Sequence, residues 1–332
     1  MYALRIDSVD PAFNLALEEI LFDTLSPENP GMFLIWRNEP SVIVGCHQNT
    51  AEEVNAAFCR ERGIHVVRRP TGGGAVYHDL GNVNFSFLVW VDKNRLAGFE
   101  EFMEPMVLAL RDLGVNAAYT SRNDITVDGR KVAGTAQRRS GQKMLHHGCL
   151  LVDVDTAALS GALAADPEKF RSKGVASHRA RVANLREFLP AGLSPERRMT
   201  MVIDAMTRRC APEERSLDPA LREKAEALAR SRYRSWEWNW GRSPRFTEKR
   251  RRRFDWGRLE CLLNVRNGVI DGCRLFGDFF ALRDIRELEA LLVGQRADPS
   301  SLRAALADAP VESWFSGARR DELLAFLCGD DQ

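Results

Sequence analysis

The chain has 332 residues, enough for about two domains of ordinary size. Its 47 Lys and Arg residues nearly balance 46 Asp and Glu residues, and this net charge of +1 favours neither nucleic acid nor a membrane as the main partner. Hydrophobic residues make up 45% of the chain, as in ordinary globular proteins, and no run reaches the roughly 18 apolar residues of a spanning helix.

The N-terminus and the cysteines indicate a reducing compartment. No basic segment followed by an apolar run stands at the N-terminus, so we expect a cytoplasmic protein. The seven cysteines are odd in number, scattered and outside any C-x-x-C pattern. We therefore expect most of them to be reduced packing residues.

The N-terminal region alternates helix and strand patterns. Asp10-Pro11 precedes an amphipathic segment, which predicts a helix whose apolar face covers a sheet. Two β-type runs, 32–37 and 41–45, lie close enough together to predict a hairpin. A helix over 51–62 is expected to end at Gly63.

A glycine-rich segment follows the β-type run 64–68 and precedes the run 84–90, which we expect to pair with its predecessor. The segment reads Arg68-Arg69-Pro70-Thr71-Gly72-Gly73-Gly74 and continues to His78, Asp79 and Asn82. Consecutive glycines let backbone N–H groups converge on an anion or lie flat against a slender ligand. A hairpin that only reverses the chain is the alternative, and the flanking charges argue against it. The spacing matches neither a P-loop nor a dinucleotide fingerprint.

A second hairpin is predicted after a helix over 99–113. Asp128-Gly129 lies between β-type residues, which places Lys131 at the start of the returning strand. Lys131 is then a site residue or an ordinary surface lysine. Asn123-Asp124 precedes the hairpin as a ribose or Mg²⁺ contact or as a simple turn. His146 and His147 begin the next β-type segment and should face opposite sides of a strand, which argues against a shared zinc ion.

The remaining sequence predicts a basic loop and a separate C-terminal unit. Residues 170–185 fit neither the helix nor the strand pattern of apolar residues. They carry four cations without a carboxylate, as in a mobile functional loop. Helices are expected over 195–210 and 219–231, and a half-buried strand over 236–240. The basic run 249–253 is interpreted as a solvated segment at a domain boundary, with a nucleic-acid patch as the alternative. A hairpin over 259–275 and three further helices then form an α+β unit.

The candidate site combines cations and backbone donors with few carboxylate bases. Arg68, Arg69, the glycines, Lys131 and the basic loop suit stabilisation of developing negative charge better than proton abstraction. Phosphate-containing substrates fit this pattern. No nucleophile elbow with a Ser-His-Asp order is present.

Four ordered motifs resemble the lipoate-protein ligases, a family within the biotin/lipoate ligase superfamily. They are the glycine segment 68–82, the pair Asn123-Asp124 with Lys131-Val-Ala-Gly134, the triplet His146-His147-Gly148, and the segment from Lys173 to Leu185. Residues 236–239 and 275–280 extend the resemblance over nearly the whole chain. The sequence departs from the family pattern at Pro70-Thr71, where Arg-Ser is frequent, and at Cys149, where threonine is common.

The resemblance implies an α/β, mixed α+β fold with two parts. A large biotin/lipoate-ligase-like catalytic domain, residues 1–246, would contain mixed β-sheets with flanking helices. A small α+β C-terminal accessory domain would span 254–332. It also implies residues that bind lipoate or its adenylate, with Lys131 as the catalytic residue and Asp124 as a possible Mg²⁺ ligand. The binding residues are Arg69, Gly72, Gly73, Gly74, Ala75, Val76, His78, Asn82, Asn123, Asp124, Lys131, Gly134, His147, Gly148, Lys173, Ser177 and Arg181.

The implied reaction has two steps. Lipoate and ATP with Mg²⁺ give lipoyl-AMP, and a lysine of an acceptor lipoyl domain then attacks that mixed anhydride. Acceptors would be the E2 subunits of 2-oxoacid dehydrogenases and the glycine cleavage H protein. The basic loop would close over the intermediate and keep water away.

Three other functions remain open at the level of sequence. An octanoyl- or lipoyltransferase would form a cysteine acyl-enzyme at Cys149 or Cys46 and need no ATP. Another transferase would use preformed lipoyl-AMP. A non-catalytic lipoate-binding protein would have no use for a charge placed at the reacting carboxyl group.

Overall fold

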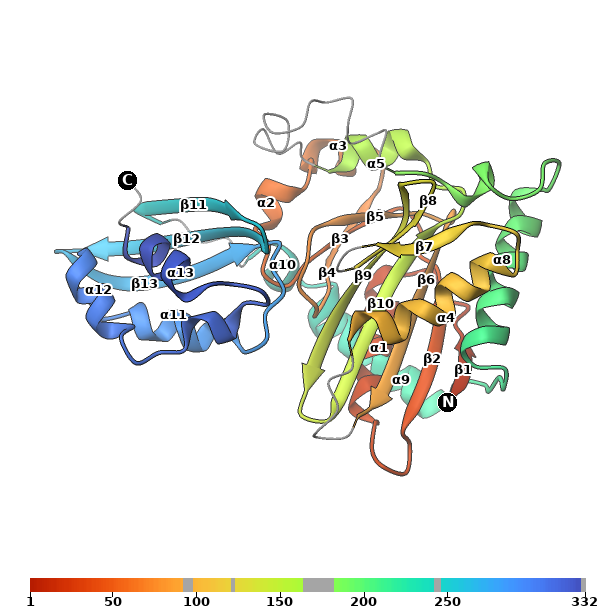
Figure 1. Cartoon of the computed structure of the whole chain (residues 1–332), viewed down its shortest axis with the longest axis horizontal. Helices are drawn as coiled ribbons and strands as arrows, with labels where there is room; N and C mark the ends of the chain where they lie inside the picture. Colours follow the sequence, from red (N-terminus) through yellow and green to blue (C-terminus); the bar gives the residue numbers. More distant parts are fainter. Residues whose placement is uncertain (92–97, 121–122, 164–181, 242–245, 330–332) are drawn as a thin grey trace.

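The computed structural model describes residues 1–91, 98–120, 123–163, 182–241 and 246–329. These residues form one seven-stranded sheet and two three-stranded sheets with helices around them (Figure 1). The mixed α/β fold class expected from sequence is confirmed. The division at 1–246 and 254–332 stays a prediction.

The large sheet is the centre of the fold. From edge to edge it contains β1 (Tyr2–Arg5), β2 (Gly31–Trp36), β6 (Asn82–Trp90), β10 (Lys143–Leu151), β9 (Arg130–Ser140), β8 (Asp124–Val127) and β7 (Ala117–Thr120). β1 runs parallel to β2 and the other neighbours are antiparallel. Because side chains alternate along a strand, β2 sends Phe33 to one face and Leu34 to the other.

Helices cover both faces of this sheet. α4 (Phe99–Arg111) and α8 (Pro195–Cys210) pack on the face of Phe33, whereas α1 (Pro11–Asp23) and α9 (Pro219–Leu228) lie on the face of Leu34 (Figure 1). The Asp10 carboxylate caps α1 by accepting a hydrogen bond from the Ala12 N–H at 2.8 Å. The predicted N-terminal helix is confirmed, and so are the predicted bounds of α8.

A second sheet carries the glycine segment. Its order is β4 (His65–Arg68), β3 (Ser41–Val44) and β5 (Val76–His78). The predicted hairpin over 32–45 is wrong, because β2 belongs to the large sheet and β3 to this one. The predicted pairing of 84–90 with its predecessor is also wrong, since β6 pairs with β2 and β10. Strands β2 and β3 are each buried on both faces, so neither shows the alternation of polar and apolar residues that could indicate its partner strand.

Several short helices depart from the sequence patterns. Asn55 splits the expected helix into α2 (Thr50–Glu53) and α3 (Ala56–Glu61), because its side chain caps the Phe58 N–H. The predicted strand over 236–240 is wrong, since α10 (Trp236–Asn239) begins at the cap Ser235. Other elements here are α5 (Thr156–Ala162), η1 (Leu185–Glu187) and η2 (Ala229–Tyr233).

The C-terminal part has its own sheet and apolar core. It contains β11 (Glu248–Phe254), β12 (Gly257–Arg266), β13 (Val269–Gly277), α11 (Ile285–Leu292), α12 (Pro299–Ala305), η3 (Val311–Trp314) and α13 (Arg320–Cys328). The β12–β13 hairpin is confirmed, and its turn residues Asn267 and Gly268 have φ values of 51° and 75°. The basic run forms strand β11, which is partly exposed to solvent and from which Lys249 and Arg251 face the buried Glu260 at 3.6 and 3.4 Å.

The two parts meet beside α2. Arg258 of β12 forms a buried ion pair with Glu53, and Lys249 Nζ lies 2.5 Å from Glu52 Oε1. The Gly277 N–H donates to the His47 carbonyl oxygen at 2.7 Å. None of the helices in the described ranges is long and apolar enough to cross a membrane.

Candidate active site

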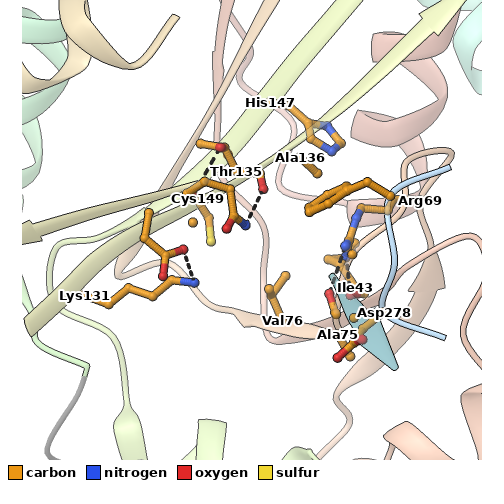
Figure 2. Close-up of a pocket in the computed structure, with 18 of the residues that line it drawn as sticks. Ile43, Arg69, Ala75, Val76, Lys131, Thr135, Ala136, His147, Cys149 and Asp278 are labelled. Atoms are coloured by element: carbon orange, nitrogen blue, oxygen red, sulfur yellow. Dashed lines mark hydrogen bonds and ion pairs between the residues drawn. The ribbon is translucent and has the colours of Figure 1, made fainter. Parts of the chain in front are cut away.

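A cavity of about 590 Å³ opens between the large sheet, the glycine segment and the C-terminal part (Figure 2). Twelve of the residues predicted to bind the ligand line it. They are Arg69, Gly73, Gly74, Ala75, Val76, His78, Asn123, Asp124, Lys131, Gly134, His147 and Gly148. Lys173, Ser177 and Arg181 lie outside the described residues.

Gly72 and Asn82 do not line the cavity. A Cβ on Gly72 would lie 2.6 Å from the Phe279 carbonyl oxygen, so this glycine allows the C-terminal part to approach. The Asn82 Oδ1 accepts a hydrogen bond from the Asp79 N–H at 2.9 Å. Asn82 therefore stabilises the turn that follows the glycine segment.

One row of residues across the large sheet forms the floor of the cavity. Strand register aligns Trp36 with Asn84, Asn84 with Cys149, Cys149 with Gly134, and Gly134 with Asp124. All five line the cavity. The floor therefore runs from an indole on β2 to a carboxylate on β8.

Lys131 lies at the carboxylate end of this row. Its Nζ is 2.7 Å from Asp124 Oδ1, an ion pair drawn as the dashed line at Lys131 in Figure 2. Both side chains are partly exposed. A Cβ on Gly134 would lie 2.8 Å from that Nζ, so the ammonium occupies the space that the glycine leaves above β9. A cation held this way can stabilise negative charge on a ligand oxygen.

The glycine segment is held by Arg69. Its Nε–H donates to Thr71 Oγ1 at 2.9 Å, and its Nη2 donates to the Gly72 and Gly74 carbonyl oxygens at 2.7 and 2.8 Å. Burial lowers the pKa of Arg69 to about 10, which still leaves the guanidinium charged at neutral pH. Arg69 thus shapes the loop and brings a positive charge to the cavity wall.

Arg68 has a structural role instead of contacting the cavity. Its side chain is fully buried and donates to carbonyl oxygens of Gly45, Gln48 and Trp238 at 2.8, 2.7 and 3.0 Å. These contacts join the second sheet to α10. The two adjacent arginines therefore have different roles, and only Arg69, the one named by the family resemblance, reaches the cavity.

A buried hydrogen-bond chain supports the other end of the cavity. The Trp36 Nε1–H donates to Ser86 Oγ at 3.0 Å, and the Ser86 hydroxyl donates to Glu18 Oε1 at 2.6 Å. His147 Nδ1 lies 2.9 Å from the same carboxylate oxygen, and His147 Nε2 lies 2.8 Å from Thr71 Oγ1. A carboxylate oxygen can only accept, so we assign the proton of His147 to Nδ1, which donates to Glu18. The Thr71 hydroxyl, which accepts from Arg69, then donates its own proton to His147 Nε2. Glu18 thereby fixes Trp36 and His147 together.

His78 is a neutral donor in the same wall. Burial and then the nearby Arg69 charge lower the pKa of His78 to about 3. Asn38 Nδ2 lies 3.1 Å from His78 Nδ1, while Asn38 Oδ1 accepts from the Asn14 amide at 3.0 Å. Asn38 therefore donates to Nδ1, which leaves the proton of His78 on Nε2.

The two candidate nucleophilic cysteines differ in position. Cys149 lies in the cavity floor, and its burial raises the pKa of the thiol, which opposes thiolate formation. Cys46 lies beside the glycine segment, where its backbone N–H donates to the Thr71 carbonyl oxygen at 2.9 Å. All seven cysteines are free, six of them buried, as expected from sequence.

The C-terminal part closes one side of the cavity with residues that were not among the predicted site residues. They are Arg253, Asp255, Trp256, Gly257, Asp278 and Phe280. The Gly73 N–H donates to the Phe279 carbonyl oxygen at 3.3 Å, which joins this wall to the glycine segment. Leu15, Trp36, Ile43, Asn84, Thr135 and Ala136 were missed as well, because ordinary apolar or strand residues carry no motif.

Carboxylates near the cavity could assist a metal ion that arrives with a substrate. Asp124, Asp255 and Asp278 line it, whereas no group of three or more His, Cys, Asp or Glu side chains suited to a metal occurs within the described part of the chain. Mg²⁺ commonly uses one or two carboxylates together with substrate phosphates. Asp124 fits that limited role.

Comparison with known proteins identifies the family. The model of the lipoyl protein ligase A/B catalytic domain matches residues 10–207, and that of the bacterial lipoate protein ligase C-terminus matches residues 243–327. Lipoate-protein ligase 1 of Staphylococcus aureus is 40% identical over 318 residues, which cover 96% of this chain and 97% of that protein.

Solved structures agree with this assignment. P. falciparum LipL1 in complex with lipoate has a TM-score of 0.79 and 25% identity over 99% of this chain and 98% of its own. The bipartite ligase of Thermoplasma acidophilum, studied with its E2 lipoyl domain, has a TM-score of 0.65 and 30% identity over 74% of this chain and 98% of its own. Lipoate-protein ligase A bound with ATP has a TM-score of 0.63 and 28% identity over 72% of this chain and 98% of its own. The chain therefore belongs to the lipoate-protein ligase family.

Proposed function

We propose that this protein attaches lipoate to proteins in two steps within the described cavity. In the first step a lipoate carboxylate oxygen attacks the α-phosphorus of ATP, pyrophosphate leaves, and lipoyl-AMP forms. In the second step the amine of an acceptor lysine attacks the acyl carbon, AMP leaves, and the amine loses a proton. Family membership supports the ligase activity, and the ATP-bound relative supports the use of ATP.

The position of Lys131 is the observation that carries this proposal. Its ammonium lies at the polar end of a cavity whose other end is lined by Trp36, Leu15 and Ile43, members of one apolar cluster. An acid with an apolar chain can therefore place its carboxylate at Lys131 and its chain along the floor. Charge develops on phosphate and acyl oxygens in both steps, and a fixed cation stabilises it.

The glycine segment and Asp124 complete the proposed binding of ATP. Gly73 and Gly74 leave the cavity wall without side chains, and Arg69 holds a positive charge behind them. We infer that Mg²⁺ enters with the phosphates and uses Asp124 as one ligand. The segment containing Lys173, Ser177 and Arg181 stays a predicted adenylate-binding loop.

We infer that the acceptors are folded lipoyl domains. The relative studied with its E2 lipoyl domain supports acceptors of this kind, and the glycine cleavage H protein is a further candidate. A cytoplasmic location, where these substrates and ATP meet, is part of the proposal.

The decisive test measures the intact mass of an apo lipoyl domain after reaction with the protein. One reaction contains lipoate, ATP and Mg²⁺, and a second contains synthetic lipoyl-AMP alone. We expect the lipoyl mass increase in both reactions. Modification with lipoyl-AMP only would indicate a transferase that cannot activate lipoate, and binding of lipoate without modification in either reaction would indicate a binding protein.

The cysteine acyl-enzyme is the second candidate function. Cys149 in the cavity floor motivates it, although burial disfavours its thiolate. Cys149→Ala should retain transfer if the adenylate route operates. Loss of transfer in this variant, together with modification from an acyl-carrier donor without ATP, would support the thioester route instead.

A further inference from the structure

Asn84 is a buried amide in the cavity floor without a partner. Its side chain is fully buried on β6, and neither Oδ1 nor Nδ2 has a hydrogen-bond partner among the described residues. Buried polar groups are nearly always paired, and leaving one unpaired is unfavourable. Because Asn84 lines the cavity, a ligand is the natural source of its missing contact.

A second unpaired donor lies in the same cavity. His78 Nε2 is buried and has no partner in the described part of the chain, and Asn38 holds the ring so that this nitrogen carries the proton. His78 and Trp36 are close, with ring centroids 6.4 Å apart. Trp36 is also the strand neighbour of Asn84. The Trp36 end of the floor therefore presents polar hydrogens that the protein itself does not use.

This polar pair lies far from the reacting carboxyl group. Asn84 is separated from Gly134, over which the Lys131 ammonium lies, by two strand-to-strand steps, or about 10 Å at the usual spacing. Lys131 pairs with Asp124, so a carboxylate bound there points its chain toward Asn84 and Trp36. The distal end of the acid, rather than its carboxylate, meets the unpaired amide.

We propose that Asn84 is a specificity-determining residue that recognises sulfur at the distal end of the acyl substrate. This inference rests on the proposed function. Lipoate and octanoate share a carboxylate and a straight chain, but only lipoate ends in a ring with two sulfur atoms. Sulfur is a weak acceptor for the Asn84 amide N–H and the His78 Nε2–H. An alkyl end leaves both donors unpaired in a site from which it has displaced water.

The test compares lipoate and octanoate as substrates of the wild type and of Asn84→Leu, with acceptor mass as the readout. We expect the wild type to prefer lipoate. In Asn84→Leu the ratio of the two kcat/KM values should fall roughly tenfold, a small effect for a polar contact because sulfur accepts weakly. The change should appear mainly in KM, since the contact is present in both ground and transition states.

Val76→Ala is the matched control, because it removes apolar contact from the cavity without changing a polar group. It should reduce turnover of both acids and leave their ratio within about twofold. Should the leucine variant fail to fold, Asn84→Ala gives the same comparison.

An unchanged ratio in a folded and active Asn84 variant would overturn the inference. Failure of the wild type to transfer either acid would overturn the proposed function, and this inference with it.

Discussion

The two ends of the cavity are built in opposite ways. At the Lys131 end, one ion pair with Asp124 joins side chains that are 38% and 28% exposed. At the other end, Glu18 and His147 are 0% and 8% exposed and belong to a continuous hydrogen-bond chain. The first end can exchange partners when a charged ligand arrives, whereas the second holds one arrangement.

This difference separates a cation that a ligand can reach from a fixed, buried scaffold. An exposed ion pair contributes little to stability, so Lys131 is available for ligand oxygens. A buried carboxylate that collects two donors contributes to the fold and cannot be removed without leaving those donors unpaired. Substitutions at the two ends should therefore affect different measurements.

The largest expected effect is on activity at the open end. Lys131→Ala should reduce acyl transfer by about 10²- to 10³-fold, because the cation that stabilises developing charge is lost. The free energy of unfolding should change by less than about 1 kcal/mol. Lys143→Ala is the control, since Lys143 lies on the adjacent strand and contacts the Asp23 carbonyl oxygen outside the cavity. Full activity of Lys131→Ala would contradict the role proposed for it.

The next effect is on stability at the closed end. Glu18→Ala leaves the His147 Nδ1–H and the Ser86 hydroxyl without their acceptor, and should lower the free energy of unfolding by about 3 kcal/mol in urea titrations. Glu39→Gln removes an exposed pair with His65 and should change it by less than about 1 kcal/mol. Equal destabilisation by both variants would show that the buried chain is not special.

The smallest effect concerns the glycine segment that joins the two ends. Gly73 and Gly268 have φ values of +91° and +75°, so alanine is strained at either position. Only at Gly73 does a Cβ meet neighbours, at 3.0 Å from Arg69 Nη2 and 3.3 Å from Phe280 Cε1. Gly73→Ala should therefore lower the melting temperature more than Gly268→Ala, by the equivalent of about 1 kcal/mol. Equal decreases in melting temperature would mean that Arg69 and Phe280 move away from the added Cβ without loss of stability.

Local signals in the sequence predicted much of the fold. Asp10-Pro11 placed a helix start because capping and the proline φ act within a few residues. Asp128-Gly129 and Asn267-Gly268 placed two hairpins because their backbone φ values are positive. Lys131 and His147 were predicted as site residues because each stands in a short local sequence pattern.

Pairing and partnership were decided only by the tertiary structure. The sequence could not separate β2 from β3 into different sheets, because both are buried on two faces and show no alternation. Residue patterns alone did not distinguish Arg68 from Arg69, although the family resemblance singled out Arg69. Nor could the sequence place Asn84 instead of Asn82 in the cavity, since these differ only in which distant groups they reach. Sequence by itself determined the family, the local elements and the catalytic lysine as a candidate. Which buried groups are satisfied, and which await a ligand, depends on contacts between residues far apart in the chain, and only the folded structure brings those together.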